Sequence, residues 1–235
     1  MTYQRAATDI FNKNQVALAV THGRFGYHIG VAFHSVHDGP KILHLSNHLK
    51  LRCDPYPPRS CWVIHPYPAP EKVLKQVVAI VRAVAKRNAQ IRYGTDFRAS
   101  RNSFDANGAY RPPKGSEGLT CASFVTEVFR AASIPLVDES TWQHSAANDE
   151  WVDGVCKMLA EERADQDHID AVLASKNGLR LRPEEVAFSG TVQYLPKSKG
   201  MDYQTAQAGA SSVVQALHAA CPVQPIPVVN SLPSN

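Results

Sequence analysis

The sequence of 235 residues predicts a single α+β domain, in which an antiparallel sheet packs against a helix that carries a cysteine at its N-terminus. Three observations predict this class. Strand-like segments separated by short turns fill the first part of the chain. Amphipathic helical segments fill most of the remainder. Between them, a polar loop ends at Thr120-Cys121, where a helix is expected to begin.

The expected sheet starts with three segments, at residues 15–22, 27–34 and 41–46. In the second segment, apolar side chains alternate with small or polar ones, which is typical of a strand with one face in the core. Short turns containing glycine separate the segments, so the second and third are expected to pair as an antiparallel hairpin. Six prolines then make residues 54–70 a loop with at most short extended pieces.

Helical patterns dominate the rest of the chain. The clearest follows Pro70, where valine, leucine and isoleucine recur at helical spacing and proline suits the first turn. Another begins at Cys121 and is expected to end before Ile134-Pro135. The expected helices lie at 71–88, from Cys121 onward, and at 148–163, 167–175 and 183–188.

The remaining segments are expected to be short strands or irregular. Apolar patterns predict strands at 91–97 and 190–195. The segment 98–118 is rich in Arg, Ser, Asn, Gly and Pro, which predicts an exposed loop inserted in a domain that spans 1–221. The Pro-rich residues 222–235 are expected to form an extended or disordered tail.

Composition limits the classes of partner. The net charge of +4 is spread along the chain without a long basic run, so we expect no nucleic-acid partner. No apolar stretch reaches the roughly 20 residues of a membrane span, so we expect no stable membrane insertion. The first residues lack the apolar core of a secretory signal, which favours a cytoplasmic location; signal-independent export as an effector is the alternative. The oligomeric state is left open.

Five cysteines are present, and no two of them form a CxxC pair. The odd number and the expected location favour free thiols. A disulfide between Cys53 and Cys61 is the alternative for an oxidising compartment. We expect no metal and no cofactor.

Cys121 is the candidate nucleophile. Its expected place in the first turn of a helix exposes the thiol to unpaired backbone N–H groups and to the helix dipole, both of which stabilise a thiolate. Thr120 before it is a suitable N-cap. Position alone slightly favours a buried structural cysteine, because cysteine is among the most buried residue types.

A cysteine nucleophile needs a base, and two histidines lie on the expected hairpin. His28 and His44 are expected on the same sheet face, beside Gly30 and Ala32, whose small side chains leave room for a helix N-terminus. We expect His28 to act as the base and His44 to orient its imidazole. Two ordinary, partly exposed strand histidines are the alternative.

Three segments carry a resemblance to a known superfamily. YHIGVAF at 27–33 resembles the histidine strand of NlpC/P60 proteins, and ILHLSNH at 42–48 resembles the neighbouring strand with its third polar residue. GLTCASFVTEVF at 118–129 resembles the helix start that carries the cysteine, with Thr120 where the family commonly has Asn or Asp. Because histidine precedes cysteine, the order resembles the circularly permuted branch.

That branch includes lecithin:retinol acyltransferase-like proteins and bacterial permuted papain-like amidases. YGTDF at 93–97 and LRPEEVAFSGTVQYL at 181–195 resemble segments of the bacterial amidases. The resemblance implies a permuted papain-like (NlpC/P60) fold and a thiol hydrolase that cleaves amide or peptide bonds through an acyl-thioester. It implies Cys121 as nucleophile, His28 as base and His44 as third residue. Tyr93 is the candidate side-chain donor to the oxyanion or substrate.

Three other functions remain open. A lipid acyltransferase or phospholipase of the lecithin:retinol acyltransferase type would use the same three residues. A metal site at His34-x-x-His37, near Asp38, is a weak pattern without an HExxH helix or paired CxxC motifs. A non-catalytic binding domain could keep the fold alone.

Overall fold

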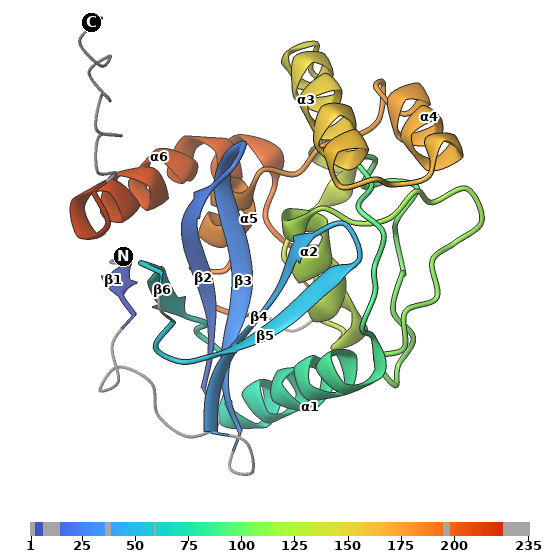
Figure 1. The fold of residues 1–235 in the computed structure, drawn as a ribbon. Coiled ribbons are helices and arrows are strands. Elements are labelled where there is room, and N and C mark those ends of the chain that lie inside the picture. Colours follow the sequence, from blue (N-terminus) through green and yellow to red (C-terminus); the bar gives the residue numbers. More distant parts are fainter. Residues whose placement is uncertain (1–2, 7–14, 36–38, 59, 195–197, 223–235) are drawn as a thin grey trace, which may run out of the picture.

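A computed structural model describes residues 3–6, 15–35, 39–58, 60–194 and 198–222. The chain forms an α+β domain with a six-stranded antiparallel sheet and, within the described residues, six α-helices (Figure 1). The strands lie side by side in the order β1-β6-β2-β3-β4-β5. Their bounds are Gln4–Arg5 (β1), Val16–Gly23 (β2), Gly26–Ser35 (β3), Gly39–Asn47 (β4), Lys50–Pro55 (β5) and Val63–Pro66 (β6).

The centre of the sheet confirms the three predicted strands and the predicted hairpin. β2 pairs with β3 from Val16 opposite Phe33 to Gly23 opposite Gly26, and β3 pairs with β4 as the expected hairpin. Strand β5 was not predicted, because its charged and proline-bounded sequence lacks an apolar alternation. It pairs with β4 and places His44 opposite Arg52.

The helices confirm five predicted segments and add one. α1 to α5 span Glu71–Arg87, Cys121–Ala131, Ala147–Glu161, Gln166–Ala174 and Pro183–Ser189. Helix α6, Tyr203–Ala220, was not predicted, although Ala206, Ala210, Val213 and Leu217 are its buried residues. A short 3₁₀ helix, Glu139–Thr141, precedes α3.

Two predicted strands are wrong. Residues 91–97 are irregular, because the Gly94 and Leu119 N–H groups bond to loop carbonyls instead of to a sheet neighbour. The described part of 190–195 is also irregular, since the Gly190 and Thr191 N–H groups bond back to the end of α5. Both segments carry the apolar pattern of a strand, but local partners satisfy their backbones first.

The inserted segment 98–118 is irregular, as predicted, but it is not uniformly exposed. Ser100 and Ser103 are fully buried, and Phe104 packs edge-on against Phe124 of α2. The Ser103 hydroxyl donates to the Ser100 carbonyl at 2.5 Å, so the buried polar groups have partners. The predicted tail, 222–235, lies outside the described residues apart from Pro222.

The two faces of the sheet differ. One face carries large apolar side chains, such as Leu18, Ile29 and Val31, which pack with α2 residues in the main core. The other face forms a small cluster that includes Ala19, Ala32 and Trp62. Side chains alternate along β3, so His28 and Gly30 belong to this second face.

The expectation that Gly30 and Ala32 leave room for the helix N-terminus is therefore wrong. Helix α2 packs on the opposite face of β3, where Ile29 and Val31 belong to the same core cluster as the α2 side chains. In Figure 1, α2 and α5 lie behind the central strands, and α1 lies below them.

The expectation of free thiols is wrong for two cysteines. Cys61, before β6, forms a disulfide with Cys221, the residue that ends α6, and their Cα atoms are 5.7 Å apart. Cys53, Cys121 and Cys156 are free thiols. Because α6 was not predicted, nothing in the sequence pattern placed Cys221 near the sheet. Within the described residues, no helix is both long and apolar enough to cross a membrane.

Candidate functional site

Cys121 is the first residue of α2, as the sequence predicts. The Thr120 hydroxyl accepts a hydrogen bond from the Ser123 N–H at 3.1 Å, and the Ser123 hydroxyl accepts one from the Thr120 N–H at 2.8 Å. This capping box fixes the helix start and confirms Thr120 as N-cap. The Cys121 side chain is nearly buried, with 6% of its surface exposed.

The surroundings of the thiol oppose its ionisation. Burial raises the pKa of Cys121 to about 11, although the Ile29 and Ala122 N–H groups and the Arg180 charge act to lower it. The helix start alone therefore does not produce a thiolate at neutral pH. Nucleophilic attack by Cys121 requires a base that removes its proton.

A chain of hydrogen bonds runs across β3, β4 and β5. His28 Nε2 lies 2.8 Å from His44 Nδ1, and His44 Nε2 lies 3.1 Å from Asp54 Oδ2. Arg52 holds the other Asp54 oxygen, with its Nη2 at 3.0 Å. Sequence reasoning predicted the two histidines but not Asp54, because Asp54 lies on the strand that it did not predict.

This chain fixes the proton positions. Burial raises the pKa of Asp54, but hydrogen bonds from His44 and Arg52 lower it by more and keep it below its usual value. The Asp54 side chain is therefore a carboxylate at neutral pH. A carboxylate only accepts, so His44 Nε2 donates to it and His44 Nδ1 accepts from His28 Nε2. The free lone pair of neutral His28 is then on Nδ1, which is the nitrogen available as a base.

Gly30 and Trp62 hold the two imidazoles together. A Cβ atom on Gly30 would lie 2.9 Å from the His44 Cβ, so the missing side chain lets His44 lean over β3 towards His28. The Trp62 ring stands edge-on to both imidazoles, at centroid distances of 5.7 and 5.4 Å. Burial, with a smaller contribution from His44, lowers the pKa of His28 to about 3. His28 is therefore neutral at pH 7.

His28 and Cys121 line the same small cavity, whose volume is about 60 Å³. Tyr93, the predicted donor, lines it as well. The Tyr93 backbone is held from both sides, by the His48 ring at 3.2 Å from its N and by the His168 ring at 3.0 Å from its O. The structure thus brings all four predicted site residues to one region: three line the cavity, and His44 lies directly behind His28.

Within the described residues, the Cys121 thiol and the His28 ring are not joined by a hydrogen bond. Both residues line the cavity, as does Tyr27 near the hairpin end of β3. The cavity is large enough for a few water molecules. Both residues thus line one cavity, although the His28 ring packs with Trp62 on one face of β3 and Cys121 belongs to the core on the other face.

Two residues of this cavity were not predicted. Arg180, in the segment before α5, and Trp151, on α3, both line it. The Arg180 guanidinium carbon lies 3.8 Å from the centre of the Trp151 ring, which is a cation–π contact. Position 180 lies in the segment Arg180-Leu181-Arg182, but only the tertiary fold brings it to the cavity of Cys121.

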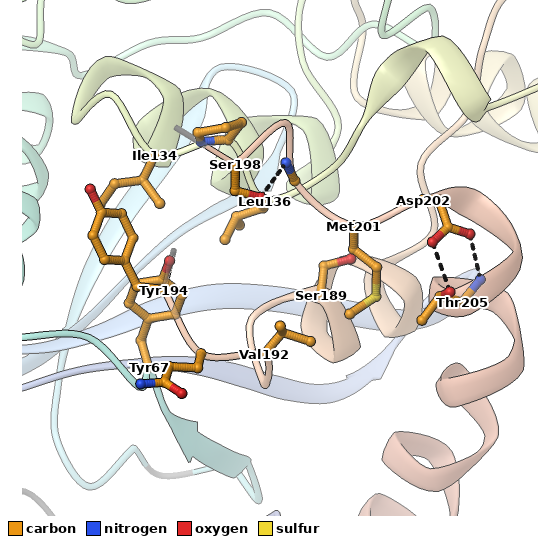
Figure 2. A pocket seen from close by; sticks show the side chains of 13 residues that line it. Tyr67, Ile134, Leu136, Ser189, Val192, Tyr194, Ser198, Met201, Asp202 and Thr205 are labelled. Atoms are coloured by element: carbon orange, nitrogen blue, oxygen red, sulfur yellow. Dashed lines mark hydrogen bonds between the residues drawn. The ribbon is translucent and has the colours of Figure 1, made fainter. Parts of the chain in front are cut away.

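A larger cavity, drawn in Figure 2, offers less chemistry. Its volume is about 300 Å³, and it lies between α5, the start of α6 and the segment after α2. Asp202 is its one carboxylate, and that group caps α6 by accepting from the Thr205 N–H at 3.0 Å and the Thr205 hydroxyl at 2.8 Å. The other lining residues are tyrosines, serines and a threonine, the amide of Gln193, and glycine or apolar side chains (Figure 2).

The proposed alternative of a metal site is not supported by a ligand cluster. Across the described parts of the chain, no group of three or more His, Cys, Asp or Glu side chains is placed to hold a metal ion. His37 and Asp38 of the candidate motif lie outside the described residues. In comparisons with known proteins, the chain matches no family model, no curated protein and no solved structure.

Proposed function

We propose that the protein is a thiol hydrolase that cleaves an amide or peptide bond, with Cys121 as nucleophile and His28 as base. The observation that carries this proposal is the hydrogen-bonded chain from Asp54 through His44 to His28, which ends beside the cavity that Cys121 lines. A partly buried series of hydrogen bonds of this kind is a costly arrangement for a purely structural role, because each buried member must have a partner. Its terminal nitrogen is left free as a proton acceptor.

The first half of the reaction forms an acyl-enzyme. His28 Nδ1 takes the Cys121 proton as the sulfur attacks the acyl carbon and the C–S bond forms. The orphan N–H groups at the start of α2 and the Tyr93 hydroxyl stabilise the negative oxygen. Protonated His28 then gives its proton to the leaving nitrogen as the C–N bond breaks, leaving a thioester and a free amine.

The second half releases the acid. His28 removes a proton from water, the hydroxide oxygen attacks the thioester carbon, and the C–S bond breaks. The sulfur recovers its proton from His28. Throughout, the Asp54 carboxylate stabilises the positive charge that appears on the imidazoles.

We further propose that the fold is of the permuted papain-like type. The support is the chain order, in which the histidine hairpin precedes the cysteine helix, and the position of Cys121 at a capped helix start against that sheet. In this proposal, 98–118 is the insertion that separates the two halves.

The Cys61–Cys221 disulfide bears on location. Thioredoxin and glutathione keep most cytoplasmic thiols reduced, whereas disulfides persist in oxidising compartments. The disulfide therefore favours export as an effector over residence in the cytoplasm. Measuring the mass of the protein from its native source, alkylated before and after reduction, tests this location.

The test of function is capture of the acyl-enzyme. The protein is incubated with a mixed library of fluorogenic peptide amides and, separately, with phospholipid vesicles, and is quenched in acid for mass spectrometry. We expect an acyl adduct on Cys121 from peptide amides, with no adduct in C121A and a normal adduct in the matched control C156A. Adducts from phospholipid alone would favour the lipid acyltransferase alternative, and no adduct from either source contradicts the proposal.

A further inference from the structure

The guanidinium of Arg180 is a positive charge that lines the cavity of Cys121, and it has no carboxylate partner in the described part of the chain. Within the described residues, no Asp or Glu oxygen lies within 4.0 Å of its guanidinium, and its buried Nε has no hydrogen-bond partner. The charges of Glu184 and Glu185 act on it only at longer range, without an ion pair. Glu185 is engaged with the Arg182 N–H at 3.1 Å. A partly buried cation with spare donors is costly unless it meets an anion.

The placement of Arg180 is rigid. Its guanidinium stacks on the Trp151 ring at 3.8 Å, and both residues line the cavity. The other arginine of this cavity, Arg24, lies at its rim and is already paired with Glu161 at 2.5 Å. Arg180 is thus the cation left for a ligand among the described residues of the cavity.

We propose that Arg180 binds a carboxylate of the substrate, next to the acyl group that Cys121 attacks. The planar guanidinium matches a carboxylate with two parallel hydrogen bonds, and stacking leaves its edge free for them. The N-terminal end of the α2 dipole adds positive potential at Cys121, which lines the same cavity. The inference rests on the proposed function, and it narrows the substrate to acyl compounds or peptides that carry a carboxylate beside the scissile bond.

Alkylation of Cys121 by two reagents of similar size tests this proposal. Iodoacetate carries a carboxylate and iodoacetamide a neutral amide; with either, the sulfur forms a bond to carbon and iodide leaves. The test uses C53S/C156S protein, so that Cys121 is the reactive thiol, with the Cys61–Cys221 disulfide intact. The ratio of the iodoacetate rate to the iodoacetamide rate is compared with that of the same protein unfolded in urea.

We expect the folded protein to favour iodoacetate by about tenfold over the unfolded chain, as expected for a desolvated charge pair. R180Q should lose this preference, R180K should keep part of it, and the neighbouring variant R182Q should keep all of it. Thermal melting confirms that each variant is folded. A preference unchanged in R180Q overturns the proposal, as does an equal fall in both rates, which would make Arg180 a stabiliser of the thiolate.

The two proposals fail differently. If iodoacetamide reacts with Cys121 as fast in H28A as in the parent protein, His28 is not its base, and the proposed function falls together with the inference. If H28A slows iodoacetamide but the parent shows no preference for iodoacetate, only the inference about Arg180 is overturned.

Discussion

The two halves of the candidate site are built in opposite ways. In the histidine half, each imidazole is held by a hydrogen bond across neighbouring strands, and Asp54 ends the chain. In the cysteine half, the thiol is buried at a helix start, and burial raises its pKa to about 11. The base is thus fully arranged before substrate arrives, whereas the nucleophile is ionised only when its proton is taken. Substitutions in the histidine half should lower the catalytic rate strongly. Substitutions in the helix cap that supports Cys121 should mainly lower the stability of the fold.

The largest effect is expected for H28A. Removing the base should lower kcat/KM on the peptide amide that gives the acyl-enzyme by about 10²- to 10⁴-fold. Added imidazole should restore part of the rate by occupying the vacated space beside Trp62. A kcat/KM for H28A within threefold of the parent value would show that His28 is not the catalytic base.

A methyl group on Gly30 should separate the two histidines. In G30A the new Cβ would lie 2.9 Å from both the His44 Cβ and the Leu43 carbonyl oxygen, so the strands must shift. We expect a loss of stability of about 1–3 kcal/mol from overpacking and a clear fall in kcat. Urea unfolding and steady-state kinetics measure both; A32G, on the same face, is the control for a flexible strand. Unchanged kcat in G30A would mean that the His28–His44 contact is dispensable.

Asp54 should act as a positioning residue. D54A removes the group that fixes the His44 tautomer and that raises the pKa of His44 against burial. We expect kcat/KM to fall by about tenfold, with the acid limb of the pH–rate profile moving to lower pH. R52Q, which keeps the His44–Asp54 hydrogen bond, is the matched control. A fall in rate with an unmoved acid limb would assign Asp54 a structural role only.

The histidine half should make the fold sensitive to acid. Burial places the pKa of His28 near 3 in the folded protein, against an ordinary value of 6.5. Between these values the unfolded chain binds the proton and the folded chain does not, so stability is present above about pH 6.5 and declines as the pH falls towards 3. Thermal melting at pH 7 and pH 5 should show a smaller decrease in Tm for H28Q than for the parent. Equal decreases would contradict the burial of a neutral imidazole.

The smallest effect is expected at the helix cap of the cysteine half. T120A removes the acceptor of the Ser123 N–H and should cost about 1 kcal/mol of stability, measured as the urea midpoint. T120S keeps the cap and should be neutral. Because the thiol is protonated at rest, we expect T120A to change kcat/KM less than D54A does; the reverse order would mean that the cap itself activates Cys121.

The sequence predicted those parts of the site that depend on short-range patterns. Alternation along β3 and β4 is enough to place His28 and His44 on one face, and a polar residue before an apolar helix is enough to start α2 at Cys121. Five helices followed from 3.6-residue periodicity.

The remainder depends on partners that are distant in the chain. Asp54 reaches His44 only because β5 folds back along β4, and the charged sequence of that strand gives no apolar signal. Arg180 reaches the cavity through its stacking on Trp151, a contact without a sequence motif. The side of the sheet that α2 covers was predicted incorrectly, since the sequence shows where small residues lie but not which face the helix takes.

The Cys61–Cys221 disulfide makes a closed covalent ring from most of the chain, because its two cysteines are 160 positions apart in the sequence. Cys121 lies inside this ring, whereas His28 and Asp54 precede it. A protease that cuts the backbone once within the ring, for instance in 98–118, leaves two fragments that stay joined until a reductant acts. Such a cleaved molecule would run as one band on a non-reducing gel and as two bands on a reducing gel. In a medium that contains proteases but no reductant, its two fragments would therefore stay linked.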